Sequence, residues 1–164
     1  MTNANPGISR HIRPARPQEA ELLSDLALRS KSHWGYPADF LEACRDELTL
    51  SADFISASHV FVLEEEELIA GFYGLSERDS EIELLYLFVE PSAINRGYGK
   101  LLWNHAAGVA AGLGFQKISI ESDPYAEAFY RAMGACRIGL VHSSVQAGRT
   151  LPLMEFLLDP QAVI

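Results

Sequence analysis

The 164-residue sequence predicts a mixed α/β fold, in which helices cover both faces of one mostly antiparallel central sheet. Two observations support this prediction. The run Glu81–Glu90 is apolar on both of its alternating faces, which is typical of a strand in the middle of a sheet. Around it, short apolar runs alternate with longer segments of helical periodicity. Their order is a strand, two helices, three strands, a helix, a strand, a helix and two strands.

The first half of the chain is expected to form one strand, two helices and a hairpin. The expected elements are a strand over 8–15, a helix from 17 toward 32, a helix from about 37 to 48, and strands over 60–63 and 68–75. An aromatic break separates the two helices, and four glutamates over 64–67 are expected at the solvated hairpin turn. Gly71 and Gly74 suit the second hairpin strand only where another part of the chain approaches closely.

The second half contains the central strand and a long helix. Simple alternation predicts that Ile82, Leu84, Tyr86 and Phe88 share one face of the strand, opposite Leu85, Leu87 and Val89. The later elements are expected as a helix over 97–114, a strand over 117–121, a helix capped near 123 and stopped at 134, and strands over 135–141 and 151–158.

Length and composition indicate one domain over residues 9–164, preceded by a flexible tail over residues 1–8. The formal net charge of −9 disfavours non-specific nucleic-acid binding, although it could favour a cationic substrate. No run is apolar enough to cross a membrane, and no signal-peptide pattern is present. Two cysteines are too few for a disulfide framework, so we expect a cytoplasmic protein with Cys136 as a buried apolar residue.

A glycine-rich turn follows the central strand and opens the long helix. Gly97 and Gly99 carry no side chains that would block an anion, and the helix start adds a favourable partial charge. Arg96 and Lys100 flank the turn and could add contacts to phosphate. The residues do not form a P-loop, which needs Ser or Thr after the lysine, nor a dinucleotide fingerprint, which needs glycine at position 102.

Three local patterns together resemble the GCN5-related N-acetyltransferases, the GNAT superfamily. They are the strand end Leu87-Phe88-Val89-Glu90-Pro91, the turn Ile94-Asn95-Arg96-Gly97-Tyr98-Gly99, and the stretch from Asp123 through Ala126, Phe129 and Tyr130 to Gly134. The resemblance covers about 9–158. Ile94 departs from the family's usual Gln or Arg, Asp123 from its Asn, and Ala135 from its Phe. The glycine-rich turn is therefore expected to hold its ligand mainly through backbone N–H groups.

The resemblance implies acetyl-CoA as the cosubstrate, bound where a bulge in the fourth strand separates it from the next strand. The residues that it places along this cosubstrate are Leu87, Phe88, Val89, Asn95, Arg96, Gly97, Tyr98, Gly99, Lys100, Asp123, Ala126 and Phe129. One backbone N–H of Leu87 or Val89 would polarise the acyl carbonyl.

The resemblance also implies two catalytic side chains. Glu83 is the candidate general base, with Glu81 and a water relay as alternatives, because an alkylammonium must lose a proton before it can attack. Tyr130 is the candidate general acid, since a phenol can protonate a departing thiolate at neutral pH.

The acceptor is expected to be a small-molecule or peptide amine that contacts His33, Trp34 and Tyr36. No spacing of histidines indicates a metal site. The expected activity is acetyl transfer by direct attack in a ternary complex, and the alternative is a silent acyl-CoA-binding sensor of the same fold. A homodimer is possible by analogy with the family.

Overall fold

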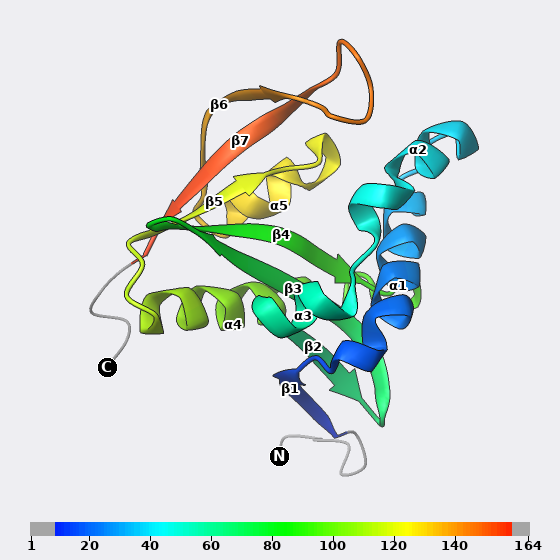
Figure 1. Ribbon diagram of the computed structural model, residues 1–164, viewed down its shortest axis with the longest axis vertical. Helices are drawn as coiled ribbons and strands as arrows, with labels where there is room; N and C mark the ends of the chain where they lie inside the picture. The colour runs from blue at the N-terminus through cyan, green and yellow to red at the C-terminus, as the bar shows by residue number, and fades with distance from the viewer. Residues whose placement is uncertain (1–8, 159–164) are drawn as a thin grey trace.

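The computed structural model describes residues 9–158, so the tail predicted over residues 1–8 lies outside the described part of the chain. The strands are β1 (Arg10–Pro14), β2 (His59–Glu65), β3 (Leu68–Arg78), β4 (Glu81–Val89), β5 (Lys117–Glu121), β6 (Cys136–His142) and β7 (Thr150–Leu157). They form one sheet in the order β1-β2-β3-β4-β5-β7-β6 (Figure 1). Neighbours pair antiparallel except β4 and β5, which are parallel. The predicted mixed α/β fold is therefore confirmed, whereas the single domain over 9–164 stays a prediction.

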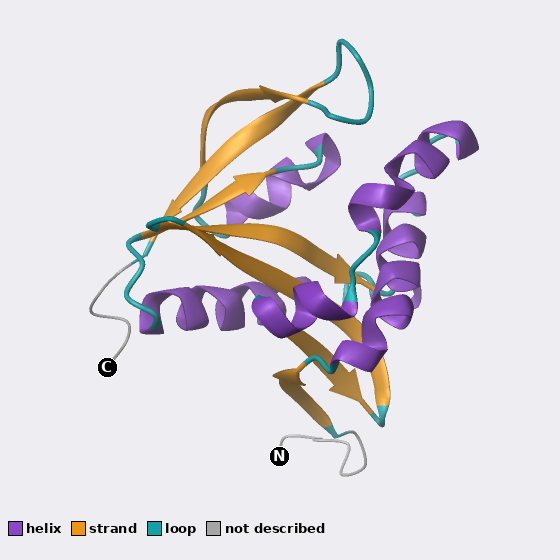
Figure 2. Cartoon of the chain, viewed as in Figure 1, coloured by secondary structure: helices purple, strands orange, loops and turns teal. Residues whose placement is uncertain are grey.

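Helices pack on both faces of this sheet (Figure 2). They are α1 (Ala20–Ser32), α2 (Ala38–Leu48), α3 (Ala52–Ala57), α4 (Tyr98–Gly112) and α5 (Glu127–Ala132), with short 3-10 turns at Pro17–Glu19, Pro91–Ala93 and Pro124–Ala126. Buried side chains of α4 and α5 form one apolar cluster with the sheet. Buried side chains of α1, α2 and α3 form a second cluster on the opposite face. The sheet thus divides the core into two layers.

A β-bulge in β4 changes which residues share a face. The register pairs Gly74 with Tyr86 but Leu75 with Leu84, so Leu85 is an extra residue in β4. As a result Ile82, Leu84, Leu87 and Val89 pack in the α4 layer, while Tyr86 and Phe88 pack in the α1 layer. The simple alternation expected for this strand is therefore wrong beyond Leu85, and the expected bulge in the fourth strand is confirmed.

Strands β4 and β5 separate beyond this bulge (Figure 1). Their pairing covers three residues of each strand and ends where Leu84 meets Ile120. β4 continues to Val89 beside β3, whereas β5 ends at Glu121 and its chain turns away into α5. The carboxyl-terminal half of β4 consequently has a hydrogen-bonded neighbour strand on one side only.

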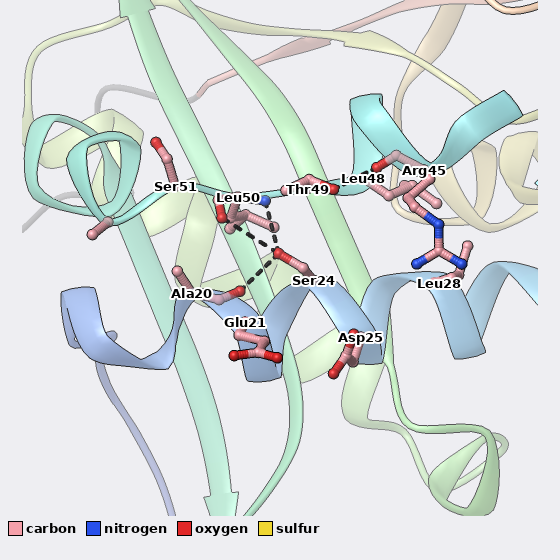
Figure 3. Close-up of a pocket in the computed structure, with 11 residues that line it drawn as sticks. Ala20, Glu21, Ser24, Asp25, Leu28, Arg45, Leu48, Thr49, Leu50 and Ser51 are labelled. Carbon is pink, nitrogen blue, oxygen red and sulfur yellow. Dashed lines mark hydrogen bonds between the residues drawn. The ribbon is translucent and has the colours of Figure 1, made fainter. Parts of the chain in front are cut away.

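The connection between α2 and β2 contains a helix that the sequence did not predict. Ser51 caps this short α3 by accepting a hydrogen bond from the Phe54 N–H at 3.0 Å. Just before it, Ser24 of α1 accepts from the Leu50 N–H at 2.8 Å and ties the connection to α1 (Figure 3). A pocket of about 350 Å³ lies beside this contact, between α1 and the end of α2.

The hairpin between β2 and β3 turns at two glutamates only. Glu66 and Glu67 adopt positive φ angles of 50° and 68°, whereas Glu64 and Glu65 belong to β2. The latter two carboxylates form ion pairs with arginines and expose only 16% of their side chains. The expected solvated tip is therefore correct for half of this acidic run.

Strand β6 forms one edge of the sheet, and its residues are mostly exposed. Cys136 is exposed there, so its expected burial is wrong. An edge strand has a neighbour on one side only, and Ile138 and Leu140 of β6 each expose 57%.

Within residues 9–158, no helix is both long and apolar enough to cross a membrane.

Candidate active site

A glycine turn stands at the carboxyl end of β4, between the 3-10 turn and α4. Asn95 and Gly97 have φ angles of 68° and 81°, in the left-handed region that glycine tolerates best. Among the described residues, no group accepts a hydrogen bond from the backbone N–H groups of 95–100. Free amides at a helix start are suited to bind an anion. This turn, residues Asn95–Lys100, is called the cradle below.

The first turn of α4 packs against α5. A Cβ added to Gly99 would lie 3.3 Å from the Phe129 ring, so the missing side chain allows this close contact. Tyr98 is 1% exposed, and its hydroxyl has no partner among the described residues. Ala126 and Phe129 pack at the edge of the same apolar cluster. The structure therefore brings these predicted cosubstrate residues together around the start of α4.

The two basic residues of the cradle differ in their surroundings. A guanidinium N–H of Arg96 donates to Glu65 Oε1 at 3.2 Å, and the guanidinium lies 4.9 Å from the centre of the Tyr98 ring. Lys100 is exposed and forms no ion pair within 9–158. Arg96 is already engaged by a carboxylate, so Lys100 is the freer of the two for a phosphate.

Backbone N–H groups of β4 face the separated strands. The Glu90 N–H donates to Ala70 of β3 at 2.8 Å, and antiparallel pairing directs alternate residues to the same neighbour. The Leu87 and Val89 N–H groups therefore point away from β3, toward the side from which β5 has diverged. Phe88 lies between these two residues, so its N–H faces β3. Its ring packs in the α1 layer.

Glu83 lies on β4, opposite Ser119 of β5, within the short parallel pairing. It is half-buried, whereas Glu81 is exposed. Burial raises the pKa of Glu83 above that of an ordinary glutamate, and the negative charge of Glu121 raises it further. Of the two glutamates considered for the base, Glu83 thus has the environment that makes a carboxylate a better proton acceptor near neutral pH.

Tyr130 lies on α5 with 7% of its surface exposed. Its ring packs edge-on against Trp103 of α4 at 5.7 Å and against Phe129 at 5.2 Å. Within 9–158 the tyrosine hydroxyls that form hydrogen bonds are those of other tyrosines, so the Tyr130 hydroxyl has no such partner there. Burial raises the pKa of Tyr130, and the charge of Asp123 raises it further, so the phenol keeps its proton at neutral pH.

Asp123 follows β5 and lies at the centre of a polar cluster. Its carboxylate accepts from the Tyr125 N–H and from the Tyr36 hydroxyl, each at 2.9 Å. It also pairs with Lys31 Nζ at 3.1 Å and, more loosely, with Arg149 at 3.8 Å. The sequence predicted Asp123 as a cosubstrate residue, and one of its partners, Tyr36, is a residue predicted to contact the acceptor.

Aromatic rings line the same region. Trp34 stacks on Tyr125 with ring centres 5.3 Å apart, and His33 meets Trp34 edge-on. Tyr36 packs against Phe40 and edge-on against Tyr125. The three predicted acceptor residues are therefore neighbours. The sequence did not single out Lys31, Phe40, Tyr125 or Arg149, because the contacting pairs lie as far as 113 residues apart.

The pocket in Figure 3 lies outside this site, since its walls come from α1, the end of α2 and the start of α3. It contains none of the predicted catalytic or cradle residues. No group of three or more potential metal ligands occurs in the described part of the chain.

Comparisons with known proteins give the fold its family. Residues 23–135 match the acetyltransferase (GNAT) family. A GCN5-related N-acetyltransferase from Rhodopseudomonas palustris superimposes with a TM-score of 0.77 at 18% identity, over 92% of this chain and 96% of that one. The PaiA N-acetyltransferase from Thermoplasma acidophilum, solved in complex with coenzyme A, gives 0.72 at 20% identity, over 90% and 98%.

The ribosomal-protein-S18-alanine N-acetyltransferase from Escherichia coli gives a TM-score of 0.69 at 16% identity, over 92% of this chain and 94% of that one. Comparison with curated proteins finds no significant sequence match. Identities this low indicate a shared fold only, but the family match covers most of the chain. The chain belongs to the GNAT acetyltransferase family.

Proposed function

We propose that the protein transfers an acetyl group from acetyl-CoA to a primary amine by direct attack in a ternary complex. The observation that carries the proposal is the free cradle N–H groups at the carboxyl end of β4, next to the point where β4 and β5 separate. A solved structural neighbour was crystallised with coenzyme A, which fits the same assignment.

Acetyl-CoA would bring the acetyl group as a thioester. The cradle amides would bind its pyrophosphate, with Lys100 adding charge. The N–H groups of Leu87 and Val89, which point away from β3, would bind the pantetheine arm and polarise the acyl carbonyl. Gly97 and Gly99 suit this role because neither places a Cβ near the amides.

Two side chains would move protons. The Glu83 carboxylate, with its raised pKa, would take a proton from the acceptor ammonium directly or through a water molecule. The Tyr130 hydroxyl would give a proton to the departing thiolate, because its raised pKa keeps that proton in place at neutral pH. Binding both reactants in one complex would supply the proximity that direct attack needs.

The test is a panel of primary amines assayed for release of free thiol from acetyl-CoA, with acetyl-CoA affinity measured in parallel by calorimetry. Panel members should include small amines, amino acids and peptides with free N-termini. Two structural neighbours are a ribosomal-protein-S18-alanine N-acetyltransferase and an N-acetylglutamate synthase, so both protein and amino-acid acceptors belong in the panel. We expect amine-dependent thiol release. Tight acetyl-CoA binding without thiol release for any amine would instead support the silent sensor of the same fold.

A further inference from the structure

Four segments that are distant in the sequence meet at one polar cluster beside the proposed active site. The members come from the last turn of α1, the α1–α2 connection, the turn after β5 and the loop before β7, and they are Lys31, Tyr36, Asp123 and Arg149. The Tyr36 hydroxyl donates to Asp123 and accepts from Arg149 Nη2, each at 2.9 Å. Lys31 Nζ lies 3.1 Å from Asp123. This set is called the Asp123 cluster below.

The Asp123 cluster has more positive than negative charge. Lys31, Asp123 and Arg149 each expose only 14–16% of their side chains, and two cations share one carboxylate. Glu47 of α2 acts on the same Cys44 thiol as these three charges, but it is exposed and accepts a hydrogen bond from Ser144. It forms no ion pair with Lys31 or Arg149. A partly buried positive charge that lacks its own negative partner destabilises the folded protein, and a bound anion would remove that cost.

Arg149 holds spare hydrogen-bond donors in a fixed orientation. Its guanidinium lies 4.7 Å from the centre of the Phe40 ring and 5.4 Å from that of Tyr36. Only its Nη2 donates within residues 9–158, and the contact to Asp123 is long at 3.8 Å. A planar guanidinium with a free edge is suited to grip a carboxylate through two parallel hydrogen bonds.

The same contacts disfavour a cationic group at this position. Lys31 Nζ lies 5.6 Å from the centre of the Tyr36 ring and 5.8 Å from that of Phe40, so these two rings already face cations of the chain itself. The overall charge of −9 suggested that a cationic acceptor was possible. Around Asp123, however, the local charge is positive, which favours a negatively charged group on the acceptor.

The Asp123 cluster adjoins the proposed general acid. Asp123 directly precedes the 3-10 turn Pro124–Ala126, which leads into α5 and so to Tyr130. The charge of Asp123 also helps to raise the pKa of Tyr130. A small acceptor could therefore keep its amine near the separated strands while a second group reaches Arg149.

We infer that the acceptor is a small amine that also carries a carboxylate, as an amino acid does, and that Arg149 and Lys31 bind this carboxylate. The inference rests on the proposed function, because it names the substrate class of the same site. Arg149 would form the paired contact, and Lys31 would add a single charge-assisted hydrogen bond.

The test compares three matched acceptors: an amino acid, its carboxamide, and the amine without the carboxyl group. An amine that carries a phosphate instead forms a fourth arm, which separates a carboxylate site from a general anion site. With the wild-type protein we expect the amino acid to have the highest kcat/KM.

In Arg149→Gln we expect kcat/KM for the amino acid to fall about 10- to 100-fold, mainly through a higher KM, with the carboxamide and plain amine unaffected. In Lys31→Gln we also expect kcat/KM to fall for the amino acid alone, but by a smaller factor. The control is Arg45→Gln on α2, whose side chain is 52% exposed and pairs with Glu42. Acetyl-CoA affinity should stay unchanged in all three variants, which also checks that they fold.

Equal kcat/KM for the three acceptors, or an equal loss for all of them in Arg149→Gln, would overturn the inference while the proposed function stands. A preference for the phosphate amine over the amino acid would also overturn it. Calorimetry with coenzyme A present separates the two proposals. Binding of the amino acid that depends on Arg149, without turnover of any amine, would uphold the carboxylate site and refute acetyl transfer. Absence of both turnover and amino-acid binding would refute both.

Discussion

Glu83 and Glu121 lie on the same face of the only parallel strand pair found within residues 9–158, on the two strands that separate beyond it. Glu83 stands opposite Ser119, and Glu121 follows two residues later, so both side chains project from one face. Burial raises the pKa of Glu83, and the charge of Glu121 raises it further, while Arg78 of β3 opposes the shift and Glu81 adds to it weakly. Next to the point where the two strands separate, Glu83 therefore has a raised pKa, which makes its carboxylate a better proton acceptor.

Glu121→Gln should shift the pH dependence of the reaction. Removing the Glu121 charge lowers the pKa of Glu83, so the acidic limb of the kcat/KM profile should move to lower pH with the same amine. The control is Glu155→Gln on β7, a carboxylate that pairs with Lys117 and is not among the charges that act on Glu83. An unmoved limb would mean that Glu83 is not the group whose ionisation controls the rate.

Glu83→Gln should lose activity and gain stability. Loss of a general base typically lowers kcat/KM by about 10²- to 10⁴-fold. Because the folded-state pKa of Glu83 is raised, the folded chain holds this proton more tightly than the unfolded chain does. The charged carboxylate therefore lowers wild-type stability progressively as pH rises from the ordinary glutamate pKa of about 4.3 through the folded value.

Glutamine carries no such charge, so the variant should have the higher Tm at pH 8, and the difference should shrink toward pH 4. Thermal unfolding at intervals between these pH values checks the trend. A variant less stable than the wild type at pH 8 would contradict the raised pKa.

The sequence predicted most of the fold, because periodicity and the glycine and proline stops act over short distances. The bulged β4 shows where this fails: Leu85 looks like any other apolar strand residue, and only its pairing with β3 reveals the extra position. The cradle was predictable for the same local reason. The Asp123 cluster was not, since Tyr36 and Asp123 meet across 87 residues and their contact depends on the whole fold.

Tyr130→Phe isolates the proposed acid. The ring packs against Trp103 and Phe129, and phenylalanine keeps these contacts, so the free energy of unfolding and the acetyl-CoA affinity should change little. The thiol product should be released about 10²- to 10⁴-fold more slowly, as is typical when general acid catalysis is lost. The checks are steady-state kinetics and calorimetry on one preparation. Wild-type turnover would remove Tyr130 from the mechanism.

Gly97 should tolerate asparagine better than alanine. Its φ angle is 81°, and a Cβ built there meets nothing within 4 Å, so the cost of substitution is backbone strain and not a clash. That strain is about 1–2 kcal/mol for an ordinary L-residue, and asparagine adopts this conformation more readily. Acetyl-CoA should therefore bind more weakly to Gly97→Ala than to Gly97→Asn. Equal affinities, with equal unfolding free energies, would show that the left-handed backbone does not shape the cradle.

Gly71 should be irreplaceable for a different reason, the close approach of three elements. A Cβ on Gly71 of β3 would lie 2.9 Å from the Phe88 carbonyl oxygen and 3.0 Å from Leu102 Cδ1 of α4. Neither the paired strand β4 nor the packed helix α4 can shift without losing its own contacts. Gly71→Ala should therefore lower the free energy of unfolding by about 1–3 kcal/mol.

The matched control is Gly108→Ala on the exposed side of α4, where a new Cβ meets nothing within 4 Å. Alanine is the better helix former by about 0.8–1.0 kcal/mol, so this variant should be more stable than the wild type. Urea unfolding of both variants measures the two effects, which should have opposite signs. If Gly71→Ala also stabilised the protein, β3, β4 and α4 would have to be less tightly packed than the structure has them. The support that α4 gives to β4, next to the cradle, would then be weaker as well.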